Sequence, residues 1–334
     1  MAGTLTRRNF LSFDFGDRHG PGSNHWIRVH RIAMACRFEV MLSEEDAGDL
    51  TAARAALDEA DNLESLLTIF RESSDTSDLN RRAAREDVVA APALFSLLVR
   101  SGELHVATEG AFDVTSTALS RCWGFLRREG RVPTDAEIEA ARALVGMEHV
   151  HLDPQTRRVR FAREGLEVNF GAIGKGYALD CMATVLRRHA TRRALLSAGR
   201  SSVLGLGGRG RCWSVDIRPV LASRKVARLC LQEGAVGTSG AGEQFVEIEG
   251  RRYGHVIDPR SGRPAGGVLG ATVVTSSAAD ADALSTAFLI GGADLAERYC
   301  RTHPGTLAIL VADSPGHPAT VIGHYSRATL EMLT

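Results

Sequence analysis

The apolar residues of the chain follow two different spacings. Over residues 50–70 and 91–108 they recur at every third or fourth position, which predicts two amphipathic helices. Pro92 suits the first turn of the second helix and Gly110 follows its end, as helix boundaries require. Over residues 27–41 apolar and polar residues alternate instead, which predicts strands.

Short strands dominate the pattern after residue 190. Further helices are predicted after residues 133–135 and at residues 177–189, 279–290 and 293–300, and a hairpin at residues 150–161. The strands are predicted at residues 194–196, 203–206, 213–217, 226–231, 245–248, 253–257, 269–275 and 306–311. Because helices and strands do not alternate regularly, the predicted fold class is α+β, with mixed or antiparallel sheets flanked by helices.

The chain is predicted to consist of a short N-terminal tail and one domain. No repeat or low-complexity linker divides residues 26–334, which are predicted to form one domain. Residues 1–25 are predicted to be a disordered tail. Residues 6–11, Thr-Arg-Arg-Asn-Phe-Leu, have the shape of a twin-arginine export signal. Charged and turn-forming residues follow them in place of the apolar stretch that such signals need, so the predicted location is the cytoplasm.

Composition excludes several classes of protein. The chain has 40 basic and 40 acidic residues, and this zero net charge argues against a nucleic-acid partner. No apolar run is long enough to predict a transmembrane segment. The six cysteines are scattered without a C-x-x-C pair, so all six are predicted to be free thiols, in agreement with a reducing compartment. Glycine is enriched, with 34 of 334 residues, and several glycines flank polar motifs.

The first of these motifs is Asn-Phe-Gly-Ala-Ile-Gly-Lys-Gly-Tyr at residues 169–177. It lies between a predicted buried strand at residues 166–170 and a predicted helix. Glycines let backbone N–H groups approach an anion, and the helix N-terminus and Lys175 add positive potential, so a phosphate site is predicted. Asn169 and Gly176 break the P-loop pattern. A tight strand–helix turn without a ligand is the alternative.

A histidine stands out in the second motif, Tyr-Gly-His-Val-Ile-Asp-Pro-Arg-Ser-Gly-Arg-Pro at residues 253–264. A predicted strand ends there at an Asp-Pro turn. His255 is a candidate general base because the ordinary pKa of histidine lies near neutrality. The alternative is a purely structural histidine.

An acidic segment, Ala-Asp-Ala-Asp-Ala-Leu-Ser-Thr at residues 279–286, is the third motif. Asp282 and Thr286 are four residues apart and share one face of the predicted helix. A carboxylate and a hydroxyl placed in this way suit Mg²⁺, which takes oxygen ligands and often binds phosphate as well. The alternative is that Asp280 caps the helix and Asp282 stabilises its first turn.

In their order and spacing, these segments resemble the FAD:protein FMN transferases of the ApbE type over residues 32–312. Residues 34–36, Met-Ala-Cys, stand where the family usually has Met-Gly-Thr, and residues 67–80 are similar to a family stretch rich in serine. The stronger matches are Gly-Ala-Phe-Asp-Val-Thr at residues 110–115, Trp-Gly-Phe at 123–125, Thr-Ser-Gly at 238–240, and the three motifs above.

The resemblance implies an enzyme with an FAD cleft between two lobes and with Mg²⁺ across the pyrophosphate. The implied FAD site consists of Met34, Phe70, Ala111, Phe112, Asp113, Asn169, Lys175 and Val256. The implied metal site consists of the Ala172 carbonyl, Asp282 and Thr286, with Ser285 beside them. His255 would activate a threonine or serine hydroxyl of a flavin-accepting redox protein subunit, which attacks the FMN phosphorus and releases AMP.

Three departures from the family pattern keep two other functions open. Phe70 replaces the commoner Tyr, Asn169 replaces Asp, and Ala-Gly-Arg-Ser-Ser at residues 198–202 replaces Gly-Gly followed by Asn or Asp. The alternatives are an FAD pyrophosphatase that yields FMN and AMP, and a non-catalytic FAD-binding protein that has lost its metal site.

Overall fold

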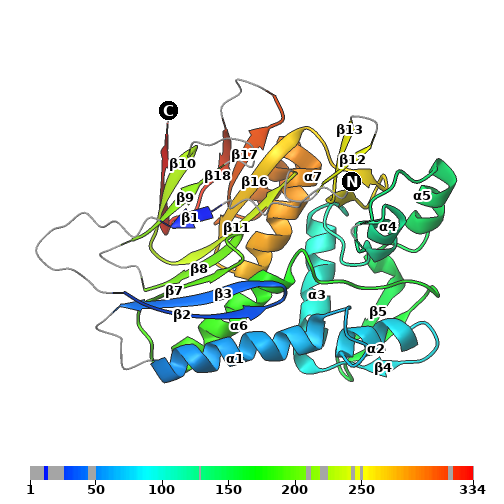
Figure 1. The fold of residues 1–334 in the computed structure, drawn as a ribbon, viewed down its shortest axis with the longest axis horizontal. Coiled ribbons are helices and arrows are strands. Elements are labelled where there is room, and N and C mark those ends of the chain that lie inside the picture. Colours follow the sequence, from blue (N-terminus) through cyan, green and yellow to red (C-terminus); the bar gives the residue numbers. More distant parts are fainter. Residues whose placement is uncertain are drawn as a thin grey trace, which may run out of the picture.

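An eight-stranded antiparallel sheet forms the centre of the computed structural model (Figure 1). The structure describes residues 11–13, 26–43, 50–127, 129–207, 212–218, 225–241, 245–248, 251–314 and 319–333. The strand order is β18-β17-β16-β11-β8-β7-β3-β2. The strands are β2 (Trp26–Ala33), β3 (Cys36–Ser43), β7 (Ala194–Ala198), β8 (Ser202–Leu206), β11 (Gly234–Gly240), β16 (Val268–Thr275), β17 (Leu307–Ala312) and β18 (Thr320–Gly323).

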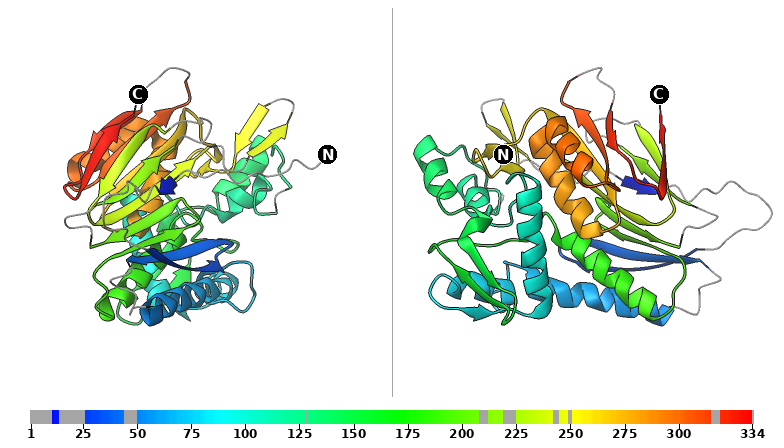
Figure 2. Two further views of the ribbon diagram at one scale, coloured as in Figure 1. Left: turned by 60° about the vertical axis from the view of Figure 1, so that its left-hand side comes forward. Right: turned by 180° about the vertical axis from the view of Figure 1, so that it is seen from behind.

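Helices α1 (Leu50–Leu67), α6 (Gly174–Arg188) and α7 (Ala278–Thr302) cover one face of this sheet (Figures 1 and 2). Their apolar faces pack with alternate residues of the strands into one core, in which Phe38, Val40 and Leu42 of β3 are fully buried. The break predicted between two helices near residue 291 lies inside α7, at Gly292, where φ is 67°. α7 therefore contains the two predicted helices joined at a kink.

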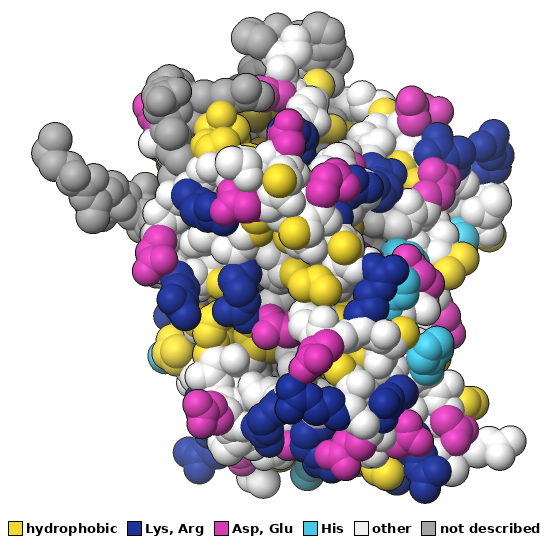
Figure 3. Space-filling view, turned by 90° about the vertical axis from the view of Figure 1, so that its right-hand side faces the viewer, with side chains coloured by type: hydrophobic (Ala, Val, Ile, Leu, Met, Phe, Trp, Pro, Cys, Tyr) yellow, Lys and Arg dark blue, Asp and Glu magenta, His cyan; other side chains and the backbone are white. Residues whose placement is uncertain are grey.

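Most of the remaining helices lie in a second lobe, formed by the described parts of residues 75–166 and 245–265. Figure 3 shows the face of this lobe, where basic and acidic side chains are interspersed. Its elements are α2 (Asp75–Arg82), α3 (Pro92–Ala107), α4 (Thr117–Cys122), α5 (Asp135–Arg142), the 3₁₀ helix η2 (Met147–His149), β4 (Val88–Val89), β5 (Val150–Asp153), β6 (Arg158–Phe161), β12 (Phe245–Ile248), β13 (Arg251–Gly254), β14 (Ile257–Asp258) and β15 (Arg263–Pro264). The predicted α+β class with antiparallel sheets is confirmed.

A four-stranded sheet packs on the other face of the large sheet. It consists of β1 (Leu11–Phe13), β9 (Trp213–Ile217), β10 (Ala227–Leu231) and β19 (Ala328–Met332). Trp213 and Val215 of β9 pack with Met41 and Val203 of the large sheet in a separate apolar cluster. Residues 11–13 of the predicted disordered tail thus differ from the prediction, because they pair with β9. The rest of residues 1–25 lies outside the described residues.

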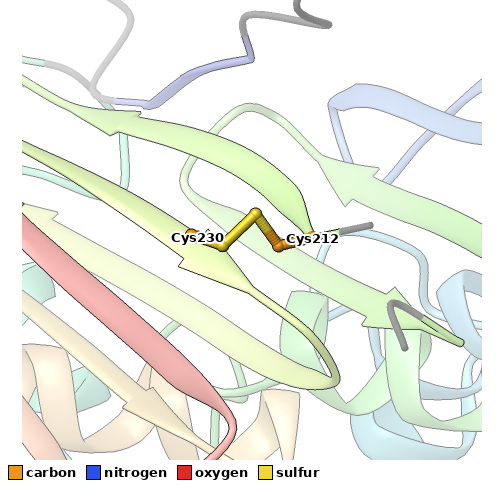
Figure 4. Close-up of a disulfide and its surroundings, with 2 residues drawn as sticks. All are labelled: Cys212 and Cys230. Atoms are coloured by element: carbon orange, nitrogen blue, oxygen red, sulfur yellow. A yellow bond between two sulfur atoms is a disulfide. The ribbon is translucent and has the colours of Figure 1, made fainter. Parts of the chain in front are cut away.

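A disulfide joins Cys212 and Cys230, with a Cα–Cα distance of 5.2 Å (Figure 4). The prediction of six free thiols is therefore wrong for these two residues. The antiparallel pairing of β9 with β10 places Cys230 opposite Ser214, two residues from Cys212, so the bridge runs diagonally between the two strands. A disulfide is typical of an oxidising compartment, so the cysteines no longer favour the cytoplasm, which stays a prediction.

Reduction of this disulfide is expected to destabilise the protein. Closing a loop of this length is worth about 3 kcal/mol, so the reduced protein should unfold at a lower denaturant concentration. Before reduction, thiol titration of the unfolded chain should find the four free cysteines, Cys36, Cys122, Cys181 and Cys300. A Cys212→Ser, Cys230→Ser double variant should be insensitive to reductant. Six reactive thiols in the unreduced protein would contradict the bridge.

Of the described helices, none is both long and apolar enough to cross a lipid bilayer.

Candidate active site

A cavity of about 370 Å³ lies where the two lobes meet. Parts of residues 113–120 and residues 255–257 line it from the second lobe. Parts of residues 169–175, residues 238–240, and Asp282 and Thr286 of α7 line it from the sheet and its helices. All three motifs predicted from the sequence therefore meet at this cavity, although more than 100 residues separate the first from the last.

The glycine-rich turn brings the start of α6 to the cavity. α6 begins at Gly174, earlier than predicted, and Lys175 lines the cavity from its first turn. A Cβ on Gly176 would lie 1.9 Å from the carbonyl oxygen of Ala278, so only glycine permits this approach of α6 to α7. The helix N-terminus and the lysine cation thus face one space, as an anion site requires.

The segment before this turn is not the predicted strand. Residues 166–170 pair with no strand, and Val168 bonds to a side chain instead: its N–H donates to Asn80 Oδ1 at 2.8 Å, and Asn80 Nδ2 donates to its carbonyl at 3.0 Å. Asn169 follows, and its Oδ1 accepts the Gly171 N–H at 3.0 Å while the residue lines the cavity. Asparagine at this position therefore shapes the turn.

Asp282 is buried beside this turn. Its Oδ2 accepts the Gly176 N–H at 2.8 Å, and its Oδ1 accepts the Ser202 hydroxyl at 2.5 Å. Burial raises the pKa of the Asp282 carboxyl, and the positive charge of Lys175 opposes that shift. The carboxylate is thus held in one orientation by two donors from two different elements.

A group of hydroxyls lies one turn further along α7. Ser285 Oγ donates to the Asp282 carbonyl at 2.8 Å. Ser239 Oγ of β11 lies 2.8 Å from Ser285 Oγ and 3.1 Å from Thr286 Oγ1. Thr286 lines the cavity, as Ala172 does, whereas Ser285 is buried behind it. Of the predicted metal-site residues, the structure therefore brings Ala172, Asp282 and Thr286 to one cavity.

This donor set suits Mg²⁺. Its ligands would be a carboxylate, a hydroxyl and a carbonyl, all of them hard oxygen atoms. Among the described residues, no group of three or more His, Cys, Asp and Glu side chains could hold a metal ion. A Mg²⁺ site with few protein ligands is typical where substrate phosphates and water complete the coordination.

The N-terminus of α7 is fixed by Asp180 of α6. Its carboxylate accepts the N–H groups of Ala278 and Ala279 and the hydroxyl of Ser277, each at 2.9 Å. Ser277, rather than Asp280, is the N-cap, and Asp280 pairs instead with Arg100 of α3 at 2.6 Å. The alternative interpretation of the third motif is therefore wrong in its capping residue.

His255 reaches the cavity from the end of β13. The following residues are anchored in the second lobe, where Ile257 packs in an apolar cluster with Trp123. Trp123 Nε1 donates to the Gly262 carbonyl at 2.8 Å, and the ring of Tyr253 lies 5.6 Å from that of Trp123. His255 and Val256, which both line the cavity, thus lie on a well-anchored segment.

The residues at 111–113 divide between core and cavity. Ala111 and Phe112 are buried in the core, and Asp113 lines the cavity. Asp113 Oδ1 accepts the N–H of Thr115 at 2.7 Å and its hydroxyl at 2.6 Å. Of the three side chains, Asp113 is therefore the one placed to contact a ligand.

Two predicted FAD-site residues lie away from this cavity. Phe70 is 76% exposed and lines a separate hollow of about 440 Å³ with Asn80 and Arg121. Met34 lies in the two-residue turn between β2 and β3, where its φ is 47°, and it is not among the residues that line either of these hollows. Of the eight predicted FAD-site residues, the structure therefore brings four to the cavity, Asp113, Asn169, Lys175 and Val256.

Sequence reasoning missed Asp180, Ser202 and Ser277. Ser202 lies in the segment that departs from the family pattern, and this departure was its signal. Asp180 and Ser277 carry no signal, because an aspartate within a helix and a serine before one are both common.

The comparison with protein families shows to which family the chain belongs. The model of the ApbE family matches residues 34–311. The chain belongs to the ApbE family. Within this family, a protein from Treponema pallidum named FAD:protein FMN transferase is 31% identical over 304 residues, covering 84% of this chain and 82% of that protein. One of the same name from Klebsiella pneumoniae is 31% identical over 226 residues, covering 67% and 70%.

A solved ApbE structure has the same fold. The ApbE protein from Thermotoga maritima superposes with a TM-score of 0.81 at 27% sequence identity, covering 89% of this chain and 97% of that one. The ApbE fold therefore extends over nearly all of the chain.

Proposed function

We propose that this ApbE family member transfers the FMN moiety of FAD to a threonine or serine hydroxyl of a flavin-accepting redox protein, releasing AMP, with Mg²⁺ bound at the pyrophosphate. The observation that carries the proposal is the contact between the Asp282 carboxylate and the Gly176 N–H at 2.8 Å, next to Lys175. This hydrogen bond places the carboxylate that suits a cation next to the lysine that suits a phosphate, in one cavity. The names of the relatives support FAD as the substrate.

The metal would be held by Asp282, Thr286 and the Ala172 carbonyl, with Ser285 and Ser239 orienting Thr286. When bound, Mg²⁺ supplies positive charge against the two phosphates of FAD. Ser202 holds the carboxylate in place, as second hydrogen-bond partners of metal ligands generally do.

FAD would be bound along the cavity by Asp113, Asn169, Lys175 and Val256. Ala111 and Phe112 would act through the backbone shape of their loop, since both side chains are buried. The exposed ring of Phe70 offers a stacking face for an aromatic ring of FAD at the neighbouring hollow. Met34 would contribute only where the cofactor extends beyond both hollows.

The transfer step is a single displacement at phosphorus. The acceptor hydroxyl oxygen forms a bond to the FMN phosphorus, its proton passes to His255, and the bond to the AMP phosphate breaks. The Lys175 cation, which lines the cavity from the first turn of α6, stabilises the negative charge that develops on the departing AMP. No covalent enzyme intermediate is needed, because positioning and charge stabilisation carry phosphoryl transfer.

Replacing His255 with alanine tests this step. The rate of transfer should fall by about 10²–10⁴-fold, the usual worth of a general base, while the affinity for FAD changes little. Covalent flavin fluorescence of the denatured acceptor measures the rate, and calorimetry measures the affinity. His151→Ala, which removes an exposed histidine of β5, is the control and should behave as wild type. An unchanged rate in His255→Ala would contradict the role of this residue.

A further inference from the structure

His105 near the end of α3 contacts Asp113 behind the cavity. Its Nδ1 lies 3.1 Å from Asp113 Oδ2, with 21% of the His105 side chain and 1% of the Asp113 side chain exposed. Although the distance is short, the geometry at Nδ1 falls short of a hydrogen bond, and this buried nitrogen makes none within the described part of the chain. The contact is therefore an ion pair whose strength depends on the charge of the imidazole.

The other oxygen of Asp113 is already fixed. Oδ1 accepts both donors of Thr115, and the Thr115 hydroxyl in turn accepts the Gly146 N–H at 2.7 Å. These bonds hold the carboxylate in one orientation whatever the pH, because none of the three donors titrates. His105 is thus the partner of Asp113 that can change its charge.

Three other charged groups surround the imidazole. Glu148 of η2 is exposed, and its Oε2 lies 3.9 Å from His105 Nε2. The stem of Arg260 passes over Gly110 beside the ring, and its guanidinium is bound to Asp258 at 2.9 Å. The two carboxylates nearest the ring, Asp113 and Glu148, both favour its protonated form, whereas the Arg260 charge is balanced by Asp258.

We propose that His105 is a positioning residue for FAD: its protonated ring neutralises the Asp113 carboxylate at the cavity, so that FAD binds more weakly once the ring is neutral. This inference rests on the proposed function, because it takes the anionic FAD as the ligand beside Asp113. A neutral His105 would leave the negative charge of Asp113 uncompensated in a cavity that binds an anionic ligand, and this charge would weaken binding.

The direction of the pH dependence follows from the contact. The ion pair with Asp113 raises the pKa of His105 above its usual value of 6.5, and burial opposes the shift. The imidazole of His105 is therefore protonated below pH 6.5, and it loses its proton as the pH rises through the raised pKa. FAD affinity should fall over the same range, on the order of tenfold for each unit by which FAD binding shifts the pKa of His105.

Calorimetric titration of FAD into the full chain, at fixed excess Mg²⁺ and at pH values from about 6 to about 9, tests the inference. The wild type should bind FAD about tenfold more weakly at the upper end. His105→Asn keeps a neutral donor near Asp113, so its affinity should be independent of pH and equal to that of the wild type at the upper end. His149→Asn, which removes a neighbouring histidine near Glu148, should retain the wild-type profile.

The outcomes distinguish a failure of the inference about His105 from a failure of the proposed function. If the wild type and His105→Asn lose affinity in parallel, His105 is not responsible and the inference is overturned. If the wild type binds no FAD at any pH, the proposed function itself fails. Thermal melting at each pH confirms that every variant is folded. In NMR titrations, Asp113→Asn should lower the pKa of His105 toward 6.5, and an unchanged pKa would also overturn the inference.

Discussion

Asp282→Ala is expected to reduce FMN transfer on the order of a thousandfold, because metal-ion stabilisation of a phosphoryl transition state is worth several kcal/mol. The variant removes the carboxylate that lies beside Lys175 and the start of α6. FAD should still bind, but added Mg²⁺ should no longer strengthen its binding. The rate of acceptor flavinylation and the calorimetric affinity for FAD, each with and without Mg²⁺, measure the two effects.

Asp280→Asn is the matched control, since this residue lies two positions away on α7 and pairs with Arg100 outside the cavity. It should retain transfer within a few-fold of the wild type. Asp282→Ala also leaves the Gly176 N–H and the Ser202 hydroxyl without their acceptor, at a cost of about 1–3 kcal/mol. Asp282→Asn keeps one acceptor oxygen and provides a better-folded variant. Mg²⁺-dependent transfer at the wild-type rate in both variants would rule out a metal at this carboxylate.

Gly176→Ala is expected to cost about 2 kcal/mol or more of unfolding free energy and to abolish most transfer. The added Cβ would lie 1.9 Å from the Ala278 carbonyl oxygen and 2.7 Å from the Ala279 nitrogen, both of them backbone atoms that cannot rotate away. α6 and α7 must separate, which breaks the contact between Gly176 and Asp282. The higher helix propensity of alanine, about 1 kcal/mol, does not offset the clash.

Chemical denaturation measures the stability of this variant, and the flavinylation rate measures its activity. Gly266→Ala is the control, because a Cβ at that exposed glycine meets no atom within 4 Å. It should leave both quantities unchanged. A Gly176→Ala variant as stable as the wild type would show that α6 and α7 are not in close backbone contact at this position.

Much of the local structure could be predicted from periodicity. The helices predicted at residues 50–70 and 91–108 are confirmed as α1 and α3, with ends within a few residues. The two helices predicted at residues 279–290 and 293–300 are confirmed as the two parts of α7, which meet at the kink at Gly292. The apparent strand at residues 166–170 was wrong for a physical reason. Its alternating buried residues resemble a strand, but Asn80 takes the place of a neighbouring strand.

Long-range pairing could not be predicted in this way. The Cys212–Cys230 bridge depends on the register of β9 with β10, which no local pattern encodes. The same holds for Asp180, which caps a helix almost 100 residues away, and for His105, which acts through Asp113. The site itself was predictable only because its motifs occur in the order of a known family, since each motif alone left a structural role open.

The stoichiometry of AMP release tests the central claim most directly. The protein is incubated with FAD and Mg²⁺, with and without a flavin-accepting redox subunit, and AMP, free FMN and acceptor-bound FMN are quantified by mass spectrometry. Transfer predicts that AMP appears only with the acceptor and equals the FMN bound to its threonine or serine. Equal release of AMP and free FMN that the acceptor does not accelerate would contradict transfer and favour hydrolysis of FAD.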